Sequence, residues 1–413
     1  MEIKKPLYLF IISFSLLACL RVINREFSVL NAATFTLVFL LSLSVSLYAL
    51  TKLINEFNLE SQYLKRILAV FFFYELIIIV RGLSFDYNSI KDLLQSDYTF
   101  WVYLIPLFIF FDKRLPTLVL LTDILYYLGV FFLIACILHP SFITKRSTAE
   151  IFIHPFAFGC GFLLLNARYL SKRKRAVALL ALLVSVASFA FLARRNGIVS
   201  YTGFILAGLA LNAKNLNSSK FFKILPAFAA IAIIILLNTD TLPESLTKRL
   251  NQRLTEDSRS YVVDNLFADM EDNIVFGKGM NGYYYSPMGG GGENEDGIEF
   301  SIQEYRNVIE NGYLQLYLNG GIIYMVLFVL VLLPAALLGI FKSSSQFVQA
   351  SGILIFLWLV DMFIFGLPRL TLQYVLVWIC AGICYKKSLR DTPDEEISDA
   401  FLNYKDYEDT LVH

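Results

Sequence analysis

The chain has 413 residues, of which 57% are hydrophobic and only 17% are charged, and its mean hydropathy is +0.61. Soluble domains carry roughly 25% charged residues, so this composition excludes an ordinary soluble protein and indicates a membrane protein with several spans. The formal net charge is +1. A chain without excess positive charge has no general field that attracts nucleic acid, so we expect no nucleic-acid partner.

Apolar segments recur along the chain, and a helix needs about 20 apolar residues to cross a bilayer. In hydrocarbon only helices or closed barrels satisfy the backbone, and these segments do not alternate as barrel strands do. The sequence therefore predicts an all-α integral membrane protein with about twelve transmembrane helices. Their expected ranges are 7–23, 29–50, 67–80, 99–111, 115–138, 151–167, 176–193, 197–211, 224–238, 313–340, 347–367 and 370–385.

The expected helices divide the chain into four parts. Transmembrane helices one to nine fill 1–238, a large hydrophilic loop fills 239–312, helices ten to twelve fill 313–385, and an acidic tail fills 386–413. Lys and Arg concentrate in connections such as 168–175, and connections of this kind stay in the cytoplasm. The rule places the N-terminus and the tail inside and the loop outside. Residues 391–413 of the tail are acidic and poor in apolar residues, so we expect them to be disordered.

Arg194 and Arg195 lie between two apolar runs in the stretch SFAFLARRNGIVSYTGF. The expected topology puts this short connection on the outer side, where cations are the exception. Because an arginine at a helix end reaches the lipid headgroups easily, a membrane anchor is one interpretation. A site that binds an anion is the other.

The outer loop contains the segment SRSYVVDNLFADMEDN, whose apolar residues recur at helical spacing. These residues are Val263, Leu266, Phe267 and Met270. The spacing predicts an amphipathic helix that lies on the bundle or at the membrane surface. Arg259 shares the apolar stripe, where a cation needs an anion nearby. Either a local pair with Glu256 or Asp257, or a bound anion, satisfies that need.

The next segment, FGKGMNG, has the letters of the dinucleotide fingerprint G-x-G-x-x-G. No βαβ unit surrounds it, so we exclude dinucleotide binding. The glycines instead predict a tight backbone path after the surface helix, at Gly277, Gly279 and Gly282. Aromatic residues that can stack on sugar rings follow at 283–285. The acidic residues at 293–296 lack the spacing of a calcium loop, so we expect no metal site.

The loop ends in EYRNVIENGYLQLYLNGGIIYMVLF, which leads into the tenth span. Glu310 lies at the expected membrane boundary, four residues after Arg306 and directly before Asn311. Gly320 and Gly321 permit close contact between helices further along.

Four motifs in this order resemble the O-antigen ligase and Wzy-type O-antigen polymerase superfamily over residues 190–335. They are an apolar helix that ends in Arg, a large loop with an S-R-x-x helix, a G-x-G turn, and an x-N-x-Y-L stretch entering a helix with Gly-Gly. The resemblance implies metal-independent glycosyl transfer without a cofactor, at the periplasmic side of a bacterial inner membrane. The donor would be an oligosaccharide linked through diphosphate to undecaprenol, held by Arg194 or Arg195 and by Arg259. The family commonly has His where this chain has Glu310.

The chemistry of these residue types is consistent with that function. A lipid diphosphate leaves when its developing charge is neutralised, and guanidinium groups contact phosphate oxygens in pairs. An acceptor hydroxyl needs a base, which a carboxylate at the mouth of a bundle can supply when burial raises its pKa. We expect Glu310 and Arg259 to be catalytic, and Arg194, Arg195, Arg259 and Arg306 to bind the diphosphate. The alternative for Glu310 is a structural pair with Arg306.

The sequence favours a polymerase that joins lipid-linked repeat units, with membrane lipid and a chain-length regulator protein as further partners. An O-antigen ligase or O-oligosaccharyltransferase is the first alternative, because the acceptor is not visible in the sequence. A transporter or flippase is the second, supported by Glu75, Asp123 and Asp361 inside expected spans and by Arg21. Ion pairs that hold the bundle together explain these acids equally well, and no broken helix pair is apparent.

Overall fold

The computed structural model describes residues 4–27, 32–54, 60–86, 90, 96, 98–192, 194–212, 258–286, 305–364 and 366–403. The chain is an all-α membrane protein, because six of the described helices are long and apolar enough to cross a membrane. These helices are α1 (Lys4–Phe27), α2 (Ala32–Leu53), α5 (Leu115–Leu138), α7 (Arg146–Leu165), α8 (Lys172–Phe191) and α13 (Gly312–Phe341).

Other helices complete the bundle or cover its ends. Those within the bundle are α3 (Gln62–Gly82), the 3-10 helix η1 (Phe100–Phe110), α9 (Arg195–Asn212), α14 (Gln346–Asp361) and α15 (Leu372–Tyr385). The shorter elements are α6 (Ser141–Thr144), η2 (Ala167–Tyr169), α12 (Ser258–Asp269), η4 (Glu271–Asn273), β1 (Tyr284–Tyr285), β2 (Tyr305–Arg306), α16 (Lys387–Asp391) and α17 (Asp394–Leu402).

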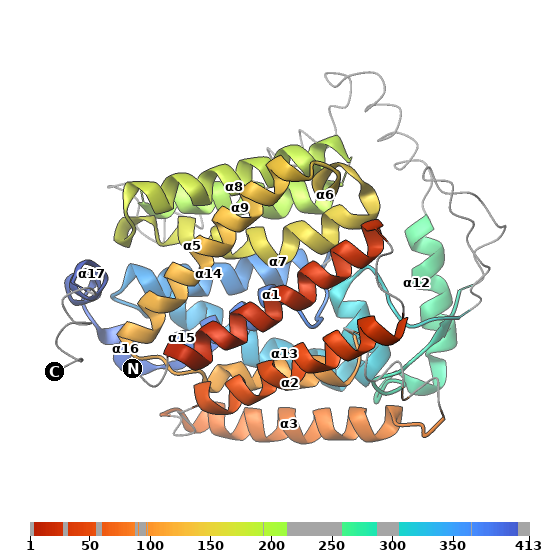
Figure 1. The fold of residues 1–413 in the computed structure, drawn as a ribbon. Coiled ribbons are helices and arrows are strands. Elements are labelled where there is room, and N and C mark those ends of the chain that lie inside the picture. The colour runs from red at the N-terminus through yellow and green to blue at the C-terminus, as the bar shows by residue number, and fades with distance from the viewer. Residues whose placement is uncertain are drawn as a thin grey trace.

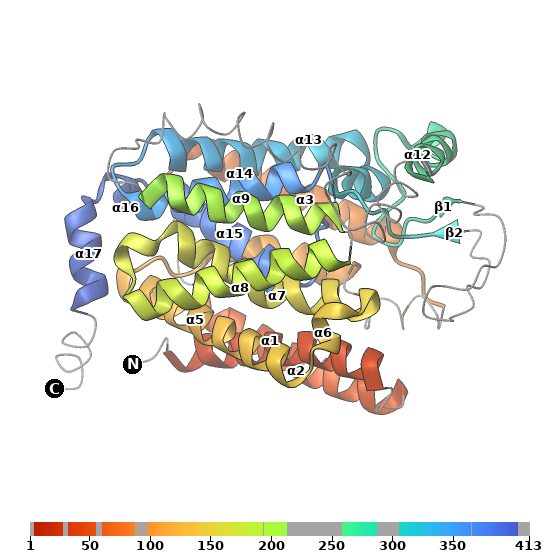
Figure 2. The ribbon, with the colours of Figure 1, turned by 90° about the horizontal axis from the view of Figure 1, so that it is seen from above.

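The long helices run side by side, so their ends gather at two ends of the bundle (Figure 1). Helix α12 and the strands β1 and β2 lie at one end, which we call the α12 end (Figure 2). Helices α16 and α17 lie at the opposite end, which we call the α17 end. One continuous apolar core joins the helices between the two ends.

Several helices begin where a polar side chain caps the first turn. The hydroxyls of Ser61, Ser171, Ser345 and Thr371 each accept a hydrogen bond from a backbone amide three residues later. Such caps satisfy amides that the helix itself leaves unpaired. The local sequence therefore determines where α3, α8, α14 and α15 begin.

The helices lie close to the ranges that the sequence predicts. The expected span 115–138 coincides with α5, while the expected span 224–238 lies outside the described residues. The expected span 99–111 forms the 3-10 helix η1, with Pro106 inside it. A 3-10 helix rises about 2.0 Å per residue, so this short segment extends further than an α-helix of equal length.

Helix α13 is broken at Gly321, which differs from the continuous span expected over 313–340. Gly321 has φ 65° and ψ −166°, a conformation open mainly to glycine. The amide of Ile322 donates to the carbonyl of Ile274 at 2.9 Å, and the Tyr74 hydroxyl of α3 donates to the carbonyl of Gly320 at 2.8 Å. Backbone groups released by the break are thus paired within the protein, as a hydrocarbon environment requires.

The expectation of disorder over 391–413 is wrong for residues 394–402, which form α17, while residues 404–413 lie outside the described residues. Ile397 is fully buried, and Phe401 packs on the rings of Tyr169 and Phe347. Asp394 accepts a hydrogen bond from the Tyr169 hydroxyl and another from the amide of Gln346 at 2.7 Å. Few apolar residues are enough here, because they share one face of α17.

Candidate functional site

Glu310 lies directly before the first turn of α13, at the α12 end. Asn311 caps this turn, and its side-chain amide donates to the carbonyl of Phe363 at 2.8 Å. The amide of Gly312 donates to the carbonyl of Met362 at 2.9 Å. These bonds fix the start of α13 on the turn that follows α14, while the Glu310 side chain remains exposed. The expectation of a buried carboxyl group is wrong, because Glu310 directly precedes the helix and its side chain points away from the core, on a backbone that is held in place.

Arg306 lies in β2, opposite Tyr284 of the antiparallel strand β1. Tyr284 is 1% exposed, and burial raises the pKa of its phenol, so the hydroxyl stays neutral. A small core attaches this ladder to α12 and α13, formed by Leu266, Met270, Tyr284, Ile309, Tyr317 and Leu318. Arg306 therefore projects from a backbone that is anchored on both sides.

Two exposed aromatic rings lie beside Arg306. Tyr285 and Tyr305 are partners in the ladder, with ring centroids 5.4 Å apart. Both rings are exposed, at 41% and 58%. Aromatic faces of this kind bind apolar faces of ligands, including sugars.

Helix α12 holds the ladder through one carboxylate. Asp269 forms an ion pair with Lys278 at 2.5 Å and accepts a hydrogen bond from the amide of Tyr285 at 3.2 Å. The positive charge of Lys278 is thus matched by Asp269. On the apolar stripe expected for this helix, Leu266 is buried as predicted, whereas Phe267 is half exposed and rests its ring on Tyr317.

The glycine turn after α12 enters the break in α13, and this explains the motif FGKGMNG. Gly277 and Gly279 have positive φ, at 66° and 89°. The amides of Lys278 and Gly279 donate to the carbonyls of Leu318 and Asn319, both at 2.8 Å. The tight path predicted for the glycines is present, and its role is to pair with a broken membrane helix.

Arg194 contacts Glu150 of α7 at the start of α9. Its Nε lies 2.9 Å from the Glu150 Oε1, without the alignment of a hydrogen bond, so the contact is an ion pair. Both side chains are 16% exposed. The nitrogen in this ion pair is Nε, which joins the guanidinium group to the side chain, and not one of the two terminal nitrogens.

A buried polar cluster lies behind Arg194, between α7, α9 and α14. The Ser200 hydroxyl donates to the carboxylate of Asp361, and the Tyr201 hydroxyl lies 3.1 Å from the Nδ1 of His154. Asp361 is the last residue of α14, so it lies at a helix end rather than in the middle of a span. Arg369 is also buried and interacts electrostatically with His154 and Asp361.

The described contacts bring Arg194, Arg306 and Glu310 to the same end of the bundle. Ser200 of α9 contacts Asp361, and the turn that follows Asp361 holds the start of α13 next to Glu310. Arg306 and Glu310 form no ion pair with each other within the described residues. Arg195 begins α9 and Arg259 lies in the first turn of α12, but their side chains lie outside the described part of the structure.

Sequence reasoning missed Glu150 and Arg369. Glu150 lies in the first turns of α7, and nothing in its local sequence indicates a partner in α9. Arg369 follows Pro368 between two apolar runs, a position that resembles that of Arg194. A comparison of all outer connections would have drawn attention to it.

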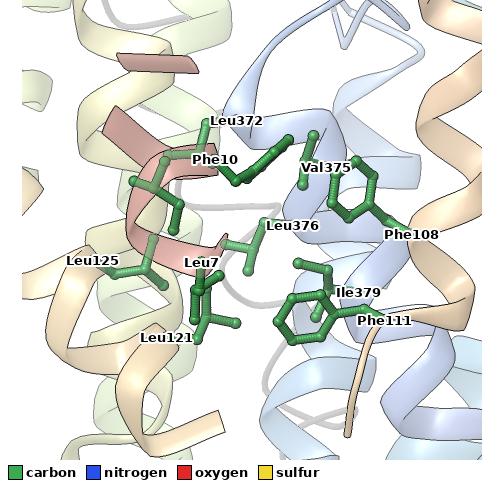
Figure 3. A pocket seen from close by; sticks show the side chains of 11 residues that line it. Leu7, Phe10, Phe108, Phe111, Leu121, Leu125, Leu372, Val375, Leu376 and Ile379 are labelled. Carbon is green, nitrogen blue, oxygen red and sulfur yellow. The ribbon is translucent and has the colours of Figure 1, made fainter. Parts of the chain in front are cut away.

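The protein also has an apolar pocket between α1, η1, α5 and α15. Figure 3 shows its lining, which includes Phe10, Phe108, Leu121 and Val375 and carries no polar side chain. Such a lining offers no group for acid, base or phosphate chemistry. Among the described residues, no group of three or more His, Cys, Asp or Glu is placed to hold a metal ion.

Comparison of the chain with protein-family models, with curated proteins and with solved structures found no match. A functional proposal therefore rests on the residues of this chain.

Proposed function

We propose that the chain is a membrane glycosyltransferase that polymerises undecaprenyl-diphosphate-linked oligosaccharide repeat units. The observation that carries the proposal is the grouping of Arg306, Glu310 and the Tyr285–Tyr305 pair on the anchored β1–β2 ladder and the adjoining start of α13, at the α12 end. A cation, a carboxylate and exposed rings are the groups that a sugar diphosphate and a sugar acceptor require.

In the proposed reaction, a hydroxyl oxygen of the acceptor attacks the anomeric carbon of the donor. The bond from that carbon to the diphosphate oxygen breaks, and the diphosphate leaves on its lipid. Glu310 takes the proton from the acceptor hydroxyl. Arg306 stabilises the charge that develops on the diphosphate, and Arg194 contributes through the terminal nitrogens of its guanidinium group.

The charge distribution supports a cytoplasmic α17 end and a periplasmic α12 end in a bacterial inner membrane. Arg168, at the start of the basic segment 168–175, contacts Asp394 of α17 at 2.6 Å. Basic connections of this kind remain in the cytoplasm. The exposed residues Asp272 and Ser171 test this orientation. A cysteine at Asp272 should react with a membrane-impermeant thiol reagent added to cells from outside, and one at Ser171 should not.

The function is tested in cells that lack the native gene, by the length of the glycan chains on a gel. The variants Glu310→Gln, Arg306→Lys and Arg194→Lys should leave single repeat units. Lysine keeps the charge but loses the paired contact with phosphate. A general base contributes about 10² to 10⁴ in rate, so Glu310→Gln should abolish visible polymer.

Matched controls are Glu271→Gln, an exposed acid of the same loop, and Arg173→Lys at the α17 end. Both should make full-length polymer. If the three site variants also do so at normal membrane levels, the proposal is wrong. If the three site variants instead accumulate full-length polymer on the lipid carrier, the protein is a ligase, because a ligase moves the finished chain from that carrier to its acceptor.

A further inference from the structure

Glu75 is a buried acid that the proposed glycosyl transfer does not use. It is 2% exposed and lies about 10 Å along α3 from the helix end at Gly82, at 1.5 Å per residue. Its Oε1 accepts a hydrogen bond from the Tyr324 hydroxyl of α13 at 3.0 Å. Its Oε2 has no hydrogen-bond partner among the described residues.

The described titratable groups that interact with Glu75 are aromatic hydroxyls. Tyr103 of η1, Tyr324 of α13 and Tyr374 of α15 lie close enough to interact with it electrostatically, and Tyr74 is its neighbour in α3. Within the described residues no Lys or Arg forms an ion pair with Glu75. A carboxylate without a cation is strongly disfavoured in such a place, and the group takes up a proton instead.

A line of polar side chains leads from the α12 end toward Glu75. The side-chain amide of Gln315 donates to the carbonyl of Asn307 at 3.0 Å and to the Oδ1 of Asn319 at 3.2 Å. The amide of Asn319 donates to the Tyr103 hydroxyl at 3.2 Å. The ring of Tyr103 lies 6.1 Å from that of Tyr324, the residue bonded to Glu75. The hydrogen-bonded polar groups thus run from the α12 end to the Tyr103 hydroxyl, and the ring of Tyr103 packs in the aromatic cluster that holds Glu75.

We propose that Glu75 is a proton-binding site inside the membrane, and that its proton exchanges with the α12 end through water that enters beside the polar groups of Asn307, Gln315, Asn319 and Tyr103. The ligand is a proton, which passes between water at the α12 end and the carboxyl group without any redox change. The site is independent of the proposed glycosyl transfer, because neither Glu310 nor Arg306 belongs to it.

The first experiment is labelling of the protein in lipid vesicles at neutral pH with dicyclohexylcarbodiimide, an apolar reagent that attacks protonated carboxyl groups. The acid proton moves to a reagent nitrogen and the carboxyl oxygen bonds to the central carbon, so the residue gains the mass of one reagent molecule. Peptide mapping of the native protein should place this mass on Glu75. Asp123, which is paired with Lys174, and the exposed Glu310 should remain unlabelled.

Failure of Glu75 to label at neutral pH, or labelling that Na⁺ suppresses at constant pH, would overturn the assignment to a proton. Because the adduct is mapped on the native chain, this result does not depend on a variant that folds. The variant Glu75→Gln should lose the adduct.

The second experiment follows the infrared C=O stretching band of the protonated Glu75 after transfer from H₂O to D₂O. The band should shift in the native protein, and Glu75→Gln should lack it. Tyr103→Phe removes one hydroxyl from the polar line and should slow the shift at least tenfold. Tyr374→Phe removes a nearby hydroxyl outside the line and should not. Equal exchange rates in the two phenylalanine variants would contradict the path.

Discussion

The amide nitrogen of Ile322 donates a hydrogen bond at 2.9 Å to the carbonyl oxygen of Ile274, a residue of the loop that precedes α13. In the same region the amide of Met280 donates to the carbonyl of Ile78 in α3 at 3.1 Å. The segment 274–280 is therefore inserted between α3 and α13 at the level of the break. As a result, the loop at the α12 end and the outer part of α13 form one structural unit, and this unit carries Glu310.

The break should not tolerate a side chain at Gly321. A Cβ atom there would lie 2.2 Å from the carbonyl oxygen of Val275, and the φ of 65° is itself unfavourable for alanine. Strained backbone of this type costs about 1–3 kcal/mol. Gly321→Ala should lower the melting temperature of the purified protein and its yield in membranes.

Gly203 provides the matched control for this prediction. It lies in α9, and a Cβ added there would meet its nearest neighbour, Leu357, at 3.6 Å. Gly203→Ala should leave the melting temperature unchanged or raise it, since alanine is the better helix former by about 1 kcal/mol. Equal melting temperatures for the two variants would show that the break is not under this constraint.

The sequence predicted the positions of the described helices of the bundle well, because apolar runs and caps are local signals. The expected span 115–138 matches α5, and Ser61 and Ser171 mark helix starts. The break at Gly321 could not be predicted in this way. It interrupts an unbroken apolar run and exists only because a segment distant in sequence supplies hydrogen-bond partners.

The order of residues in the tail predicts a helix, although the composition of the tail does not. Pro393 is followed by three acids in the first turn of α17, and Ile397 and Phe401 lie one turn apart on one face. A proline before acidic residues is a typical helix start.

In the candidate site, the contacts of Arg194 could not be predicted for a different reason. Glu150 belongs to another helix, and only packing brings it near Arg194.

Helix α17 should stabilise the α17 end through Asp394. This carboxylate accepts hydrogen bonds from Tyr169, Arg168 and the amide of Gln346, so it joins three separate segments of the chain. Asp394→Ala leaves these donors without their partner, and we expect it to lower the melting temperature by several degrees. Glu396→Gln, at an exposed position of the same helix, should have no effect. An unchanged melting temperature for both variants would mean that α17 adds no stability.

Asp123 should act as a structural partner of Lys174, joining α5 to α8, and not as part of a transport pathway. The two side chains form an ion pair and each is about one-quarter exposed, at 26% and 27%. Either single reversal, Asp123→Lys or Lys174→Asp, places like charges together and should reduce the folded yield. The double variant restores the pair and should recover that yield, as measured by size-exclusion chromatography in detergent. Recovery would be absent if each residue had a separate role.

Tyr305 should bind the sugar of the substrate through its exposed ring. The ring lies 5.4 Å from that of Tyr285, and the residue is the direct neighbour of Arg306 in β2, so a glycan attached to a bound diphosphate would pass over it. Tyr305→Ala removes the stacking surface. We expect the KM for the lipid-linked repeat unit to rise roughly tenfold, which corresponds to about 1.4 kcal/mol of binding free energy.

The kcat of Tyr305→Ala should change little, because the ring contacts substrate and transition state alike. Tyr305→Phe keeps the ring and should behave as the native protein. Tyr127→Ala, at an exposed position of α5 away from the loop, is the control for a general effect of removing an aromatic ring. A loss of kcat without a change in KM in Tyr305→Ala would contradict a binding role. It would indicate that the ring orients Arg306 in the reaction.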